Sequence, residues 1–93
     1  MVTVILTIQL ALPGVNSLKE KRHIIKSLIT HIRNNFNVSV AEIAENDILR
    51  RATIGVAVVS NSNSFGHQVV SKAVNWVEKI PEVIILDYQT ESY

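Results

Sequence analysis

A regular alternation of side chains at the start of the chain constrains its fold more than any other feature. One face of this segment is wholly aliphatic and consists of Val2, Val4, Leu6, Ile8 and Leu10. The other face mixes polar and apolar side chains: Thr3, Ile5, Thr7, Gln9 and Ala11. A period of two indicates a β-strand, and Pro13-Gly14 ends it. A strand with a wholly aliphatic face needs a second layer to cover that face.

Two segments with helical periodicity can form this layer. The first begins at the capping box Ser17-Leu18-Lys19-Glu20, in which each of the two end side chains accepts a hydrogen bond from the other's backbone amide. This helix is predicted to extend to about Asn34, with an apolar stripe made of Leu18, Ile25, Leu28, Ile29 and Ile32. The second helix is predicted from about Phe65 to Lys79, before Pro81. Its inward side chains are predicted to be Phe65, Val69, Ala73, Trp76, Val77 and Ile80.

Three further strands are predicted over residues 36–43, 52–59 and 83–88, which gives the order β-α-β-β-α-β. Right-handed crossovers then place both helices on one face of the sheet. We therefore expect a single α+β domain over residues 1–93, a ferredoxin-like βαββαβ sandwich with a four-stranded antiparallel sheet. The first and third strands are the most apolar, so we expect them at the centre, running in the same direction.

Composition excludes several classes of protein. The chain has no cysteine, so it can form neither disulfide bonds nor thiolate metal sites. Its apolar start lacks a positively charged segment and is interrupted at Pro13, which argues against a signal peptide or a membrane span. These features predict a cytoplasmic protein that does not insert into a membrane.

Charge is unevenly distributed, and the first helix is basic. Residues 17–34 hold five basic side chains and only Glu20 as an acid, a local charge of +4. At 100° per residue, one flank of this helix carries Lys19, Arg22, Lys26 and Arg33. Such a row can follow a phosphate backbone, so these four are the candidate RNA-binding residues. The alternative is a solvated flank whose charges pair with Glu42, Glu45 or Asp47.

No arrangement of residues predicts catalysis, a cofactor or a metal. His23, His31 and His67 lack the spacing of metal ligands, and they are interpreted as surface histidines. The turn before the first helix contains no arginine, which the acylphosphatases of this topology require for their chemistry. Glu42 and Asp47 are the best candidate acids, and we expect both to be solvated or ion-paired. We therefore expect that this protein is not an enzyme.

The uncovered face of the predicted sheet is unusually apolar. RNA-recognition motifs stack bases on aromatic side chains at this face, but the two central strands offer none here. An apolar face without such a use suggests association with a second copy, as a dimer or a dimer of dimers, through the outer sheet face or through the edge beside the last strand. The candidate self-association residues are Ile5, Ala57, Val59, Ile84 and Leu86.

Three sequence blocks resemble the YlxP-like family of small bacterial proteins, a domain of unknown function. They are Ser17-Leu18-Lys19-Glu20-Lys21-Arg22, Phe36-Asn37-Val38-Ser39-Val40-Ala41-Glu42 and Gly55-Val56-Ala57-Val58-Val59-Ser60-Asn61. The resemblance covers essentially the whole chain. It implies a ferredoxin-like fold and a gene found among transcription, translation-initiation and ribosome-maturation genes, and it implies no catalytic residues.

Two hypotheses for function follow. The first is a non-enzymatic accessory protein of translation or ribosome maturation that binds structured RNA or a ribosomal partner through the basic helix. The alternative is an oligomeric regulatory or scaffolding module that binds a small ligand at a subunit interface. A contiguous basic surface favours the first hypothesis, and an enclosed interfacial pocket with polar groups favours the second.

Overall fold

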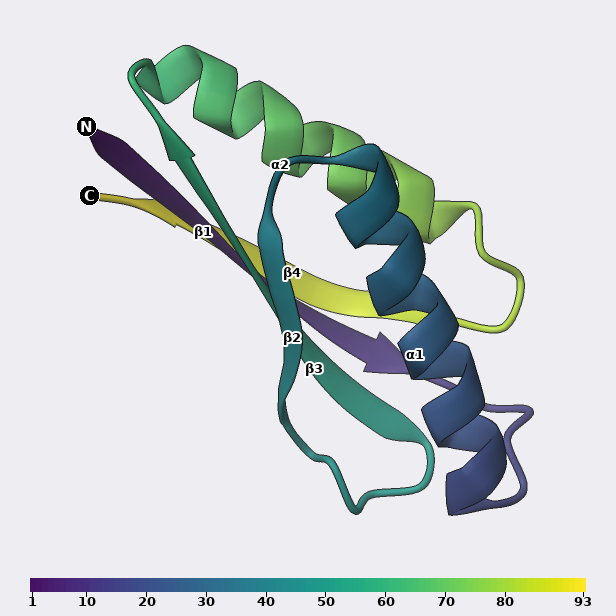
Figure 1. The fold of residues 1–93 in the computed structure, drawn as a ribbon. Helices are drawn as coiled ribbons and strands as arrows, with labels where there is room; N and C mark the ends of the chain where they lie inside the picture. The colour runs from purple at the N-terminus through teal and green to yellow at the C-terminus, as the bar shows by residue number, and fades with distance from the viewer.

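The computed structural model describes residues 1–93 and contains the predicted alternation of strands and helices. The elements are β1 (Val2–Ala11), α1 (Leu18–Asn35), β2 (Ser39–Ala44), β3 (Arg51–Ser60), α2 (Asn63–Glu78) and β4 (Ile84–Ser92). The strands form one sheet in the order β2-β3-β1-β4, and both helices lie on the same face of it (Figure 1). The predicted α+β class and βαββαβ architecture are confirmed.

The direction predicted for the two central strands is wrong. β1 and β3 are central neighbours, but they pair antiparallel, from Val2 opposite Ser60 to Ala11 opposite Arg51. The physical reason is that each helical crossover skips one strand position. β1 is therefore parallel to β2, and β3 to β4, while the strand between each such pair runs the opposite way.

Local signals set the helix ends. Ser17 Oγ accepts a hydrogen bond from the Glu20 amide at 3.1 Å, as the capping box predicts. Glu20 Oε2 accepts from the Asn16 amide, at 3.3 Å, rather than from Ser17. Ser62 caps α2 in the same way through the amide of Phe65. The helix bounds thus lie close to the predicted ones, whereas β2 begins later than predicted and β4 continues to Ser92.

The core lies between the sheet and the two helices. The aliphatic face of β1 is fully buried at Val4, Leu6, Ile8 and Leu10, as predicted. It meets the inner face of β3 and the buried stripes of the helices, which include Ile25, Leu28, Ile32, Val70, Val74 and Val77. Neither helix has the length and apolar character that a membrane span requires.

Phe65 is an exception, because it was predicted to be inward and is 56% exposed. The buried stripe of α2 begins instead at Gly66, where a Cβ atom would lie 2.7 Å from Val4 Cγ2. The helix approaches the sheet through this glycine, and Phe65 is rotated about 100° away from it toward solvent. Trp76 is only partly buried, and its ring stacks on His31 of α1 at 3.8 Å between centroids.

Candidate functional site

The basic stripe predicted on the first helix lies on the solvent side of α1. Lys19, Arg22, Lys26 and Arg33 are all exposed. α1 is an uninterrupted helix of 18 residues, so its geometry places them along one flank over about 20 Å. This length suits several successive phosphates of a nucleic-acid backbone.

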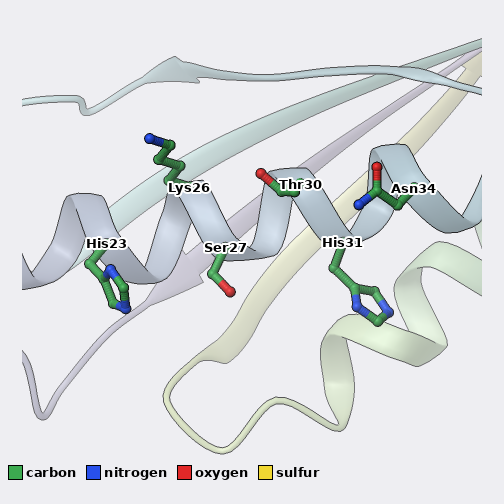
Figure 2. A pocket seen from close by; sticks show the side chains of 6 residues that line it. All are labelled: His23, Lys26, Ser27, Thr30, His31 and Asn34. Carbon is green, nitrogen blue, oxygen red and sulfur yellow. The ribbon is translucent and has the colours of Figure 1, made fainter.

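A shallow depression of about 450 Å³ lies beside this stripe and shares Lys26 with it. Its lining comes entirely from α1 and consists of His23, Lys26, Ser27, Thr30, His31 and Asn34 (Figure 2). All six side chains are polar or basic, and none is a carboxylate. The single acid of α1, Glu20, accepts a hydrogen bond in the N-terminal cap. We call the stripe and the depression together the α1 donor face.

Ion pairing neutralises little of the α1 donor face. The Arg22 guanidinium lies 3.8 Å from Asp47 Oδ1, but the two side chains are 62% and 92% exposed. An exposed pair at this distance contributes little. Arg33 donates a long hydrogen bond of 3.5 Å to the Val40 carbonyl. Neither Lys19 nor Lys26 takes part in any ion pair of the structure.

Lys21 behaves differently from the basic residues around it, because its side chain is fully buried. Its Nζ donates to the carbonyl oxygens of Glu45 at 2.6 Å, Ile48 at 2.7 Å and Asn46 at 3.3 Å. Glu42 Oε2 lies 3.1 Å from the same nitrogen as an ion pair, without the alignment of a hydrogen bond. The lysine therefore anchors α1 to the loop between β2 and β3.

That loop is shaped so that its carbonyl groups converge on the ammonium. Glu45 has a φ of 63°, the left-handed region that a residue with a Cβ rarely adopts. Its carboxylate accepts a hydrogen bond from Thr53 Oγ1 at 2.7 Å and lies 3.8 Å from Arg51. Two of the three acids that could have neutralised the α1 donor face are thus engaged elsewhere: Glu42 pairs with Lys21, and Glu45 with Arg51.

The candidate self-association residues do not lie together. Ile5 faces Ala57, and Val59 faces Thr3 at the same end of the sheet, whereas Ile84 faces Ala11 at the other end. Eight residues of β1 separate these ends, about 27 Å. The residues between them are mostly polar: Thr7, Gln9, Asp87 and Gln89. The uncovered face therefore carries two separate apolar groups rather than one patch.

Comparison with known proteins then places the chain. Residues 3–90 match the family described as "Protein of unknown function (DUF503)". The chain belongs to the DUF503 family.

One relative in this family is the uncharacterized protein YlxP of Bacillus subtilis (strain 168). It is 36% identical over 67 residues, which cover 72% of this DUF503 chain and 73% of YlxP. The YlxP-like resemblance predicted from the sequence blocks is thus confirmed. Among solved structures, the chain is similar to a REP-associated tyrosine transposase bound to a REP hairpin, with a TM-score of 0.46 and 7% identity. That match covers 98% of this chain and 55% of the transposase.

The structure also explains what two of the sequence blocks do in this DUF503 chain. Ser17 and Glu20 form the cap of α1, and Lys21 from the same block reaches Glu42 at the end of the second block. In the prediction from sequence, Lys21 contributed only to the local charge of +4 over residues 17–34. Its spacing of four, seven and eleven residues from Ile25, Leu28 and Ile32 places it on the apolar stripe, and this spacing could have revealed its burial.

Proposed function

We propose that this protein is a cytoplasmic, non-enzymatic accessory protein of translation or ribosome maturation. In this proposal it binds structured RNA through the α1 donor face. The observation that carries the proposal is the character of this face, which offers basic and hydrogen-bond-donating side chains along the helix and has no carboxylate among the six side chains of its depression.

The α1 donor face suits phosphate groups better than it suits other ligands. Lysine and arginine neutralise phosphates, and Ser27, Thr30 and Asn34 can donate hydrogen bonds to phosphate or ribose oxygens. Because the depression is shallow, it offers little surface to exclude water from a small molecule. A backbone that runs along the helix would contact several of these side chains at once.

The outer face of the sheet favours recognition of RNA by its shape rather than by its bases. The outer positions of β1 and β3 carry no aromatic ring on which a base could stack, which agrees with the sequence analysis. Contacts from one helix to phosphates position a duplex or hairpin without reading its sequence. We therefore propose that the partner is a structured RNA rather than a single-stranded sequence motif.

The ligand-binding alternative has less support. The depression on the outer sheet face, of about 260 Å³, is lined mainly by apolar residues, among them Ile5, Ala57 and Ile43. Ile43 is itself exposed. A small ligand there would need a second copy to cover it, and few polar groups would fix its orientation.

Affinity capture from cells, with and without nuclease, tests the proposal. The wild-type protein is expected to retain RNA, and Arg22→Ala/Lys26→Ala is expected to lose most of it. The matched control is Lys72→Ala/Lys79→Ala, which removes the same charge from exposed positions of α2 and its C-cap and should retain RNA. Absence of RNA from the wild-type sample, or equal retention by both double variants, would contradict the proposal.

A further inference from the structure

β4 leaves one row of backbone hydrogen-bonding groups without a partner strand. It pairs only with β1, and most of its nine residues are exposed. Thr3 and Tyr93 exchange both backbone hydrogen bonds, at 2.9 and 2.8 Å. In an antiparallel pair such bonded positions alternate with positions that point away from the partner. The amides and carbonyls of Tyr88, Thr90 and Ser92 therefore point outward from the edge of the sheet.

A side-chain contact supports this direction at one of the three positions. The amide of Tyr88 donates to Asp87 Oδ1 at 2.9 Å, which it could not do if it faced β1. The amides of Thr90 and Ser92 have no such acceptor. Two outward amides and three outward carbonyls thus remain available along one straight stretch of strand.

Most of the features that usually protect an edge strand are missing here, and the only charged side chains of residues 87–92 are Asp87 and Glu91. Natural edge strands are short, carry lysine or proline, or bulge away from a potential partner. Residues 87–92 contain neither lysine nor proline. The single irregularity of β4 lies before this stretch, because Leu86 is the extra residue between the pairs Gln9–Asp87 and Leu10–Ile85. From Asp87 onward the edge is regular and open.

We propose that this edge binds β4 of a second copy, antiparallel, about a two-fold axis at Thr90. Residues whose backbone groups point away from β1 must pair with residues of the same kind in the second copy. Thr90 then pairs with Thr90 of the second copy, and Tyr88 pairs with Ser92 of the second copy. These three pairs supply about four backbone hydrogen bonds from the amides of Thr90 and Ser92, because the Tyr88 amide of each copy donates to Asp87. The result is a continuous sheet of eight strands with all four helices on the same face. The inference does not depend on the proposed RNA binding.

Side chains select this register over its neighbours. With the axis at Thr90, Gln89 faces Glu91 of the second copy twice, and each amide can donate to a carboxylate. With the axis at Gln89, Asp87 would face Glu91 twice, and like charges placed directly opposite destabilise a strand pair. With the axis at Tyr88, Glu91 would face Ile85, and the irregularity at Leu86 would enter the new ladder.

Light scattering and sedimentation at micromolar to millimolar concentration test the proposal. The wild-type protein is expected to dimerise. Thr90→Pro removes the amide at the axis without removing a bond to β1, so it should be a folded monomer. Thr90→Ala keeps that amide and should still dimerise. A wild-type protein that stays monomeric, or a dimer unaffected by Thr90→Pro, would overturn the proposal.

A second pair of variants covers the case in which Thr90→Pro does not fold. Gln89→Glu places a carboxylate opposite Glu91 and should weaken the dimer about tenfold, whereas Gln89→Lys should not weaken it. The two Gln89 variants also distinguish an interface at the β4 edge from an interface on the uncovered sheet face. A dimer that Val59→Lys abolishes while Gln89→Glu leaves it intact would place the interface on the face and overturn the proposal.

Discussion

The two edge strands of the sheet, β2 and β4, differ in length, in regularity and in how the helices pack against them. The β2 edge has six residues, carries an irregularity between Glu42 and Ala44, and is packed against α1. The β4 edge has nine residues, and its regular part faces solvent. The difference arises from the strand order, because α1 lies over the β2 side, whereas α2 packs mainly on the central strands. One helix therefore packs against the β2 edge strand, whereas no helix packs mainly against β4.

Lys21 is the residue that attaches α1 to the β2 side of the sheet. It connects α1 to three carbonyl groups of the β2–β3 loop and to Glu42, so the helix, the edge strand and the loop form one unit. The β4 side has no equivalent anchor. Its carboxylates, Asp87 and Glu91, are exposed, and both contact groups within their own strand or its end.

The largest expected effect comes from breaking the anchor. Lys21→Met keeps the aliphatic stem but leaves Glu42 and three carbonyl groups without their cation. We expect a loss of about 2–5 kcal/mol in the free energy of unfolding, measured by urea denaturation. The exposed neighbour supplies the control, because Lys19→Met should change this free energy by less than about 0.5 kcal/mol. Equal stability of the two variants would show that the β2 side does not depend on Lys21.

A much smaller effect is expected at the end of β4. Tyr93 donates a hydrogen bond to Glu91, and this bond, followed by the charge of Glu91 and slight desolvation, raises the pKa of the phenol. A raised pKa means that the contact is present at neutral pH and is lost as pH rises through the ionisation of Tyr93. Glu91→Gln should return the pKa toward the ordinary value of about 10, which absorbance titration of the tyrosines can follow. Identical titrations of the two proteins would mean that this contact does not persist in solution.

The sequence predicted those parts of the fold that depend on local pattern. The alternation in β1 predicted its buried face, and the Ser17 cap predicted the start of α1, because both signals act within a few residues. Phe65 was misplaced because the close approach of Gly66 to Val4, a contact between distant segments, decides which side of α2 faces the sheet. The strand directions were also misjudged, although the order of elements was right.

The candidate site was predicted in part. The exposed positions of Lys19, Arg22, Lys26 and Arg33 follow from the periodicity of the helix, so the stripe was accessible from sequence. The pairing of Lys21 with the β2–β3 loop was not, because it depends on a loop whose conformation includes a positive φ at Glu45. The edge beside the last strand was an alternative site of self-association, but the outward positions of Thr90 and Ser92 could not be predicted, because the predicted strand ended at Tyr88.

The salt dependence of RNA binding tests the proposed function most directly. Each phosphate that the α1 donor face neutralises releases counterions, so the affinity of the wild-type protein for a structured RNA should fall steeply as salt rises. Arg22→Ala/Lys26→Ala should bind more weakly at every salt concentration, and the slope of log affinity against log salt should flatten by about one for each lost contact. Lys72→Ala/Lys79→Ala should keep the wild-type slope. An affinity that is independent of salt, or a slope unchanged in Arg22→Ala/Lys26→Ala, would contradict a phosphate-binding role for α1.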